Sequence, residues 1–325
     1  MLEKADNAID AGDFQLINRA YNNTFHLNRL SLGVIAPVEN YSMSAVPTMK
    51  RHVERVQLAE ALGFSAIWLR DVPFNVTSFG DAGQMFDPFV YLGLLAASTE
   101  KIALGVGSLV LPLRHPAHVA KAAASVDVLS AGRLILGVAS GDRPEEYPAL
   151  NLSFADRGAR FRESFDYIKR MSENYPAFDN SYGSSHGDMD MLPKPTSTKI
   201  PLLITGGSQQ DPAWIAANGE GWITYPRSVE AQSRIINDWR DRVKAAGGPH
   251  KPAMQSLYID LLEDPDASPK PIHLGFSSGI NYLREYLASL QEIGINHVAL
   301  NLRFNQADIE TTLKRLADEL LSDFS

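Results

Sequence analysis

The chain has 325 residues, of which 45% are hydrophobic and 21% charged, enough apolar material for a large buried core. It carries 38 acidic and 30 basic residues, and the resulting net charge of -8 argues against broad binding to nucleic acid or to anionic membranes. The absence of cysteine excludes disulfides, thiolate nucleophiles and cysteine-ligated metals.

Short apolar runs alternate with helical patterns along most of the chain. Strict alternation of this kind indicates a parallel sheet covered by helices, and about eight units favour a closed (β/α)8 barrel, the TIM barrel, over an open doubly wound sheet. The predicted strand and helix pairs are 30–36 with 48–62, 64–69 with 88–98, 102–109 with 116–129, 134–139 with 157–175, 201–205 with 211–218, 222–224 with 229–246, 254–262 with 279–292, and 296–302 with 307–322.

Residues 29–325 are predicted to form a single barrel domain. The proline- and glycine-rich stretches near 176–199 and 263–278 are interpreted as insertions, not as linkers between domains. Residues 1–28 are polar with a weak helical pattern, and we expect them to form an accessory arm across a barrel end or at a subunit contact. No window reaches the roughly 18 apolar residues of a membrane span. We therefore expect a soluble cytoplasmic protein without a membrane or nucleic-acid partner.

The segment Gly206-Gly207-Ser208 follows a predicted strand, and Asp211-Pro212 after it is typical of a helix start. Two glycines let the backbone approach a ligand, and free N–H groups at such a turn suit a phosphate. Strand-to-helix turns also use Gly and Ser whatever they bind. From the spacing alone both interpretations stay open.

Polar residues also follow the second, third and fourth predicted strands. Asp71 comes directly after Arg70 and is a candidate for orienting a base or pairing with a cation; the alternative is a local surface pair with Arg70. Arg114 and His115 follow the third strand, where His115 either contacts a ligand or caps a helix. The loop Ser140-Gly141-Asp142-Arg143, with Glu145 and Glu146, carries charges of both signs and is either a substrate rim or a solvated loop.

Several common chemistries are missing from the sequence. It has no Gly-x-Gly-x-x-Gly motif, no Walker lysine and no Gly-x-Ser-x-Gly elbow. His115 and His118 are too few to hold a metal, so no metal site is predicted.

These segments together resemble the bacterial luciferase-like flavin monooxygenase family, whose members use FMN or the deazaflavin F420. The resemblance covers roughly residues 30 to 300 in family order. Its motifs are Ala59–Phe64 with Ile67-Trp68, Ile102–Ser108, Pro112–Pro116, Val126–Arg133, Leu136–Gly141, Arg157–Glu163, and Pro201–Ser208 continuing to Gly221-Trp222.

The resemblance implies a homodimeric barrel that binds flavin at the carboxyl edge of its strands. By that resemblance Ser108 lies beside the flavin ring, Ala139, Ser140 and Asp142 lie near the cofactor, and the segment Gly206, Gly207 and Ser208 binds its phosphate. Asp71 matches an acidic position of luciferase, but Val72 stands where luciferase has a catalytically important histidine. Light emission and a luciferase-type acid–base step are therefore not expected.

The leading hypothesis is a monooxygenase that uses O2 and reduced FMN from a separate flavin reductase to oxidise a small organic substrate. Asp71, Arg114 and His115 are its candidate catalytic residues, for charge balance, anion binding and hydrogen-bond donation. The alternatives are an F420-dependent oxidoreductase that transfers hydride, a non-catalytic flavin-binding or partner subunit, and an unrelated metal hydrolase of the same fold.

Overall fold

A computed structural model describes residues 14–324 of the chain. Its centre is a closed barrel of parallel strands, in which each strand pairs with its neighbour and the pairing of β8 with β9 completes the ring. The predicted (β/α)8 barrel is confirmed. In order around the barrel its strands are β1 (Ser31–Ile35), β2 (Ala66–Leu69), β3 (Ala103–Val110), β4 (Leu134–Ala139), β7 (Leu202–Thr205), β8 (Gly221–Thr224), β9 (Ala253–Leu261) and β12 (His297–Asn301).

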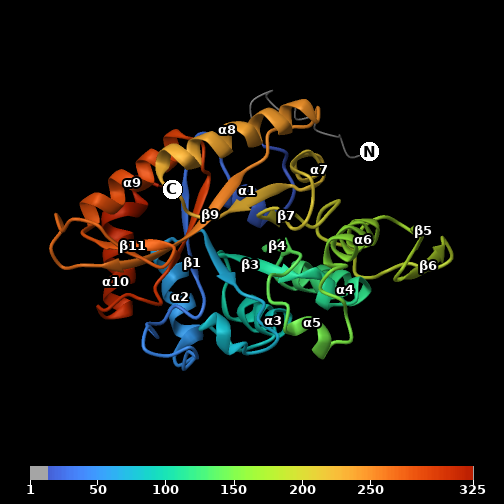
Figure 1. Cartoon of the computed structure of the whole chain (residues 1–325), viewed down its shortest axis with the longest axis horizontal. Helices are drawn as coiled ribbons and strands as arrows, with labels where there is room; N and C mark the ends of the chain where they lie inside the picture. Colours follow the sequence, from blue (N-terminus) through green and yellow to red (C-terminus); the bar gives the residue numbers. More distant parts are fainter. Residues whose placement is uncertain (1–13, 325) are drawn as a thin grey trace, which may run out of the picture.

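Helices surround this barrel, as Figure 1 shows. The helices that follow the strands are α2 (His52–Leu62), α3 (Pro88–Ser98), α4 (Pro116–Leu129), α6 (Arg157–Arg170), α7 (Pro212–Asn218), α8 (Val229–Ala245), α9 (Ile280–Glu292) and α10 (Ile309–Leu316), the last continued by a π-helical turn at Ala317–Leu321. None of the helices between residues 14 and 324 is long and apolar enough to cross a membrane.

Side chains of the strands alternate between the helices and the barrel interior. Along β2, Ile67 and Leu69 belong to the large core under the helices, whereas Ala66 and Trp68 belong to a separate interior cluster. Both faces of such a strand are buried, which explains why the strands are continuous apolar runs in the sequence.

Trp68 fills the barrel interior because facing positions carry glycine. An ideal Cβ on Gly105 would lie 2.3 Å from Trp68 Cε3, so no larger residue fits there while the indole keeps this position. The indole Nε1 donates to His297 Nε2 at 2.8 Å. His297 therefore carries its own proton on Nδ1 and donates to Ser31 Oγ at 2.7 Å, and Ser31 Oγ donates to the Thr24 carbonyl at 2.6 Å.

The segment before β1 closes the amino-terminal end of the barrel. Its helix α1 (Arg19–Thr24) places Tyr21 in the interior cluster, with the hydroxyl donating to the Glu220 carbonyl at 2.8 Å. Asn18 Nδ2 donates to the Leu134 carbonyl at 2.8 Å, at the first residue of β4. Residues 1–13 of the expected arm lie outside the described residues.

The two insertions contain short strands that the sequence analysis did not predict. The stretch 176–199 contains the antiparallel pair β5 (Ala177–Asn180) and β6 (Gly183–His186), which projects from the barrel in Figure 1. The stretch 263–278 contains two strands that were not predicted, β10 (Lys270–Ile272) and β11 (Gly275–Ser278), and β11 extends the sheet beside β9. Gly275 makes this pairing possible, since its ideal Cβ would lie 1.8 Å from the Tyr258 carbonyl oxygen.

Some predicted helix ends are also wrong. Helix α6 ends at Arg170 and not at 175, and the helix after β1 begins at His52 and not at 48. In the second case the first predicted turn contains Met49 and Arg51 with φ of 57° and 55°, a left-handed backbone that interrupts a helix.

His297 should link stability to pH. Burial lowers the pKa of its imidazole to about 3, from 6.5 in an exposed histidine. Between these values the unfolded chain binds a proton that the folded chain does not. The stabilisation is therefore complete above pH 6.5 and falls as pH drops, by up to about 1.4 kcal/mol per pH unit.

Urea unfolding of the wild type and of His297→Gln at pH 5 to 7 tests this linkage, with His186→Gln, an exposed histidine of β6, as the control. We expect a shallower pH dependence in His297→Gln only. Equal slopes for the wild type and His297→Gln would contradict it.

Candidate functional site

The carboxyl ends of β3, β4 and β7 are neighbours in the barrel and carry the residues expected near a cofactor. Parallel strands present their carboxyl ends at one edge, where enzymes of this architecture build their sites. The structure therefore brings the seven candidates to one region: Ser108, Ala139, Ser140, Asp142, Gly206, Gly207 and Ser208.

Strand β3 is irregular where it reaches this edge. Its register against β4 shifts between Val106 and Leu109, so three steps along β3 match two along β4, which is a β-bulge. The Gly107–Ser108 peptide within the bulge is cis. Gly107 is exposed, and the Ser108 hydroxyl contacts the hydroxyl of Thr205 at the end of β7. The bulge thus joins an open stretch of backbone to two hydroxyl groups.

The loop after β7 forms an open backbone turn. Gly206 has φ of 55°, and apart from its two chain neighbours no atom of residues 14–324 lies within 4 Å of an ideal Cβ on Gly207. The Gly206 carbonyl accepts a hydrogen bond from Trp222 Nε1 at 2.9 Å, which fixes the turn to β8. Ser208 Oγ donates to the Thr205 carbonyl at 2.7 Å. Asp211 caps α7 as the sequence predicted, accepting from Ala213 N at 2.7 Å.

The start of α6 packs against the turn after β7. An ideal Cβ on Gly158 would lie 3.0 Å from Gln209 Cβ, so the two segments are in contact. The preceding residue, Arg157, has a buried Nε that finds no hydrogen-bond partner among residues 14–324. A buried cationic N–H without a partner is costly. The open glycine turn and this unpartnered donor fit a phosphate at this position.

The loop after β4 is held by its own tyrosine. The Tyr147 hydroxyl donates to the carbonyl of Ser140, and both residues are buried. Gly141 has φ of 77°, which directs the chain away from the strand. Asp142 follows and is exposed. Ser140 thus has a structural bond through its backbone, while Asp142 is free to face solvent.

Asp71 and Arg114 form a buried ion pair that joins β2 to the segment after β3. Asp71 Oδ1 accepts from Arg114 Nη2 at 2.7 Å, and Asp71 Oδ2 accepts from Arg114 Nε at 3.2 Å. Asp71 Oδ2 also accepts from Val110 N at 3.0 Å. The alternative of a surface pair between Arg70 and Asp71 is wrong, because the Asp71 carboxylate is buried and Arg70 pairs elsewhere.

His115 lies at the start of α4 and not among the residues at the carboxyl ends of β3, β4 and β7. Its Nδ1 accepts from Ala117 N at 3.3 Å, as an N-cap of α4. Its ring packs edge-on against Tyr167 and Tyr182, which belong to α6 and to the insertion after it. The helix-capping alternative describes this geometry, and a contact with a ligand stays a prediction.

A charged cluster that the sequence did not reveal lies at the ends of β2 and β12. Arg70 Nη1 and Arg303 Nη1 both contact Asp81 Oδ2, at 2.5 and 2.9 Å. Burial by itself would raise the pKa of Asp81, but the charge of Arg70, the Gly83 N–H and Arg303 hold that pKa below its ordinary value. Asp81 is therefore a carboxylate shared by two arginines.

Arg143 and Glu146 in the loop after β4 complete this charged region. Arg143 Nη2 donates to the Asp81 carbonyl at 3.4 Å, and its guanidinium stacks 4.7 Å from the Phe79 ring centroid. Burial raises the pKa of Glu146, against the opposing charge of Arg143. The sequence offered one signal for this cluster, a loop with charges of both signs, but it gave no hint of Arg303.

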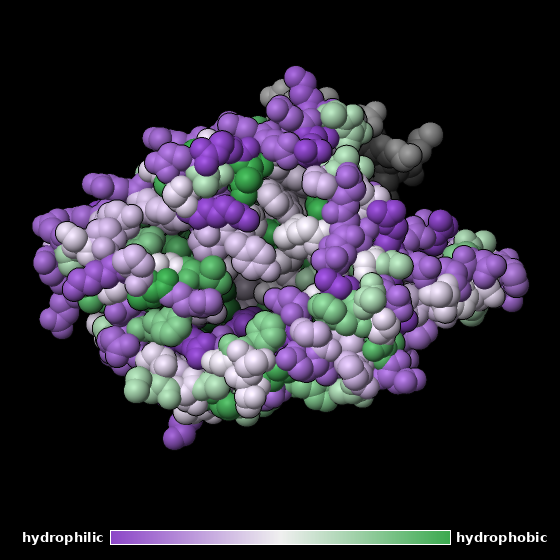
Figure 2. Space-filling model, viewed as in Figure 1, coloured by the Kyte–Doolittle hydropathy of each residue, from purple (hydrophilic) through white to green (hydrophobic). Residues whose placement is uncertain are grey.

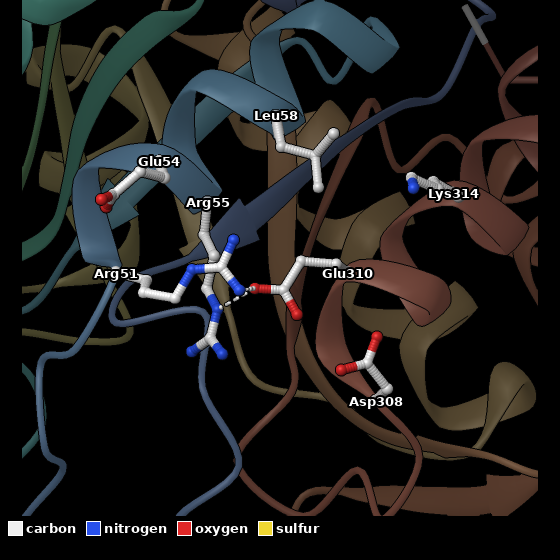
Figure 3. Close-up of a pocket in the computed structure, with 7 residues that line it drawn as sticks. All are labelled: Arg51, Glu54, Arg55, Leu58, Asp308, Glu310 and Lys314. Atoms are coloured by element: carbon white, nitrogen blue, oxygen red, sulfur yellow. Dashed lines mark hydrogen bonds and ion pairs between the residues drawn. The ribbon is translucent and has the colours of Figure 1, made fainter.

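A separate pocket of about 470 Å³ lies on the helical flank between α2 and α10. Figure 3 shows that Arg51 and Arg55 point toward Glu310, and each is 3.0 Å from its Oε1. These charges already have partners, and Arg55 Nη1 also donates to the Val38 carbonyl at 3.2 Å in the loop after β1. Its lining residues are Arg51, Glu54, Arg55, Leu58, Asp308, Glu310 and Lys314.

The fold is an α/β barrel, an architecture in which ligand sites lie at the carboxyl ends of the strands. Residues 30–262 match the luciferase-like monooxygenase family. The chain belongs to that family.

Comparison with individual proteins agrees with this assignment. Over 241 residues the chain is 27% identical to the F420-dependent glucose-6-phosphate dehydrogenase of Kineococcus radiotolerans, covering 72% of this chain and 70% of that protein. Over 168 residues it is 30% identical to the oxygenase component of the flavin-dependent trigonelline monooxygenase of Acinetobacter baylyi, covering 51% and 42%.

The fold also matches solved structures. Monooxygenase RslO1 from Streptomyces bottropensis superimposes with a TM-score of 0.74 over 91% of this chain and 100% of that one, at 19% identity. At this identity the likeness concerns the fold.

The Asp71–Arg114 pair should contribute more to stability than an exposed pair of the same length. Asp71→Asn leaves the partly buried Arg114 with only its ion pair to the 42% exposed Asp87, at 2.9 Å, and we expect a loss of about 3 kcal/mol. The control is Asp166→Asn, whose carboxylate also lies 2.7 Å from an arginine but is 57% exposed, against 1% for Asp71. Its expected loss is about 0.5 kcal/mol. Urea denaturation measures both, and equal losses would contradict the role of burial.

Proposed function

We propose that the chain is a flavin-dependent oxidoreductase, most specifically a monooxygenase that uses reduced FMN and O2 on a small organic substrate. The observation that carries this proposal is the open backbone at two adjacent points of the barrel edge. Gly107 is exposed in the β3 bulge, and within the described residues a Cβ on Gly207 would meet no other segment. A flat ring and a phosphate need backbone approach of this kind.

Each part of the site has a role in this proposal. The turn Gly206–Ser208 and Arg157 bind the phosphate, while Ser108 and the bulge face the ring. Ala139 and Ser140 border the cofactor on β4. Bound reduced flavin supplies the electrons for oxidising the substrate. The protein supplies orientation and exclusion of water, and the Asp71–Arg114 pair keeps the β2 and β3 ends in register.

The second candidate is F420-dependent hydride transfer, which the similarity to the glucose-6-phosphate dehydrogenase favours. Both cofactors have a flavin-like ring and a phosphate, so the same turn suits either. A separate flavin reductase would be needed only for the FMN reaction, as the name of the trigonelline relative, an oxygenase component, suggests for that protein.

Ser208→Asp tests the phosphate position. A carboxylate at this turn would repel a phosphate, so we expect FMN or F420 affinity to fall at least about tenfold. Aspartate tolerates the positive φ of 42° at this residue, so the turn itself should survive. Ser184→Asp adds the same charge to the exposed hairpin strand β6 and is the control.

Fluorescence titration with each cofactor measures the affinities. Unchanged binding in Ser208→Asp would refute the phosphate assignment. Oxygen uptake with chemically reduced FMN, compared with reduction of F420 over a substrate panel, then separates the two reactions. A chain that binds neither cofactor contradicts the proposed function.

A homodimer is also part of the proposal, and the surface of α3 supports it. Val90 and Leu94 on this helix are 74% and 46% exposed. Figure 2 shows green residues among white and purple ones in the lower part of the molecule, where α3 lies in Figure 1. An apolar helix face of this kind suits contact with a second copy.

Sedimentation velocity tests the homodimer. We expect the wild type to sediment at twice the chain mass of 35.7 kDa and Leu94→Glu to sediment as the monomer. Leu192→Glu, at an exposed leucine of the insertion, should not change the mass. A monomeric wild type would contradict the dimer.

A further inference from the structure

Three arginines from three strand ends meet at the loop that follows β2. Arg70 and Arg303 pair with the Asp81 carboxylate, and Arg143 donates to the Asp81 backbone carbonyl. We call Arg70, Arg143 and Arg303 the arginine cluster. Within the described residues Asp81 is the carboxylate that forms ion pairs with the cluster.

The other carboxylates near this edge do not balance the excess charge. Asp71 is paired with Arg114. Asp260 accepts hydrogen bonds from Ser277 Oγ and Gln306 N. Glu146 is near enough for the charge of Arg143 to oppose the effect of burial on its pKa, but within residues 14–324 the two form no ion pair and the buried Glu146 Oε1 has no partner. Even with Glu146 ionised, two carboxylates face three guanidinium groups. The cluster therefore retains positive charge.

Two members of the cluster also have unused donors. Arg143 and Arg303 are only 8% and 9% exposed, yet in the described part of the chain Arg143 Nη1 and Arg303 Nε have no hydrogen-bond partner. The faces of both guanidinium groups are covered, by Phe79 at 4.7 Å and by Tyr41 at 4.9 Å. Stacking occupies the face of a guanidinium and leaves its in-plane N–H groups for an anion.

Burying a cationic N–H group without a partner destabilises the folded state, because no interaction offsets its loss of hydration. A ligand anion would satisfy them. The contact that it would replace is the weakest in the cluster, the 3.4 Å bond from Arg143 to the Asp81 carbonyl. The rings of Phe79 and Tyr41 would then border the part of the ligand next to its charge.

We propose that the substrate carries an anionic group, a carboxylate, sulfonate or phosphate, and that the arginine cluster holds it at the barrel mouth. This inference rests on the proposed function, because it takes the carboxyl edge as the substrate site. The cofactor phosphate binds elsewhere, at Gly206–Ser208, so the two anions have separate positions.

Arg143 could instead have a purely structural role and only hold the loop after β2 in place. The anion site and the structural role predict different effects of Arg143→Gln on stability. If Arg143 only fastens the loop, Arg143→Gln lowers the melting temperature. If it is an anion site, removing an unpaired buried charge leaves the melting temperature of the ligand-free protein unchanged or higher. The sign of this change distinguishes the two roles before any ligand is added.

The binding test uses the full chain, with and without saturating cofactor, and measures melting temperature at fixed ionic strength. The probes are benzoate, benzenesulfonate and phenyl phosphate, with benzamide as the uncharged control. We expect at least one anion to raise the wild-type melting temperature by about 2 °C or more above benzamide. The anion that raises the melting temperature most identifies the charged group of the substrate.

Variants locate the effect. Arg143→Gln should abolish the response to the anion, and Arg143→Lys should keep part of it because the charge remains. The control is Arg242→Gln, which removes an exposed arginine of α8 paired with Asp238 and should respond like the wild type.

Three results would overturn the proposal. One is a wild type that responds no more to the anions than to benzamide, and another is an Arg143→Gln variant that is less stable and still responds. The third is loss of the benzoate response when FMN binds, together with unchanged FMN affinity in Ser208→Asp, which would assign the cluster to the cofactor phosphate. Failure of FMN and F420 titrations contradicts the proposed function separately, while the anion response would still stand.

Discussion

The contact between Trp68 and Gly105 determines how the side chains pack in the barrel interior, below the polar residues at the carboxyl ends of the strands. The indole occupies the barrel axis only because Gly105 has no side chain, and an ideal Cβ there would lie 2.3 Å from the ring. His297 accepts the indole N–H and fixes its position. With α1 packed beneath, this layer closes the barrel from the amino-terminal side. The polar residues that follow the strands lie at the opposite, carboxyl edge.

That edge divides into two regions with different chemistry. On β3, β4 and β7 the residues are small and the backbone is open, as at Gly107 and Gly207, which suits a cofactor that must approach the main chain closely. On β2 and β12 the residues are large, charged and stacked on aromatic rings. The Asp71–Arg114 pair lies at the boundary and ties the two regions together, since it bonds the β2 end to the β3 end.

Much of the fold could be predicted because its signals are local. Helices α3 and α4 begin and end as predicted, at Pro88–Ser98 and Pro116–Leu129, since a proline and a capping side chain mark each start. Strand β11 was missed because nothing in its own sequence marks it. Its pairing depends on Gly275 meeting the Tyr258 carbonyl, a partner in another strand. The residues of the proposed cofactor site were named from motifs, and the barrel brings them to one edge.

The sequence by itself determined the barrel, the family and the strand ends at which chemistry can occur, because apolar periodicity and short motifs are properties of neighbouring residues. Only the tertiary structure decided which charges meet. Asp71 follows Arg70 in the chain but pairs with Arg114, whereas Arg70 and Arg303 share Asp81. Ion pairing depends on which strand ends are adjacent and on how deeply each group is buried, and neither can be read from the order of residues along the chain.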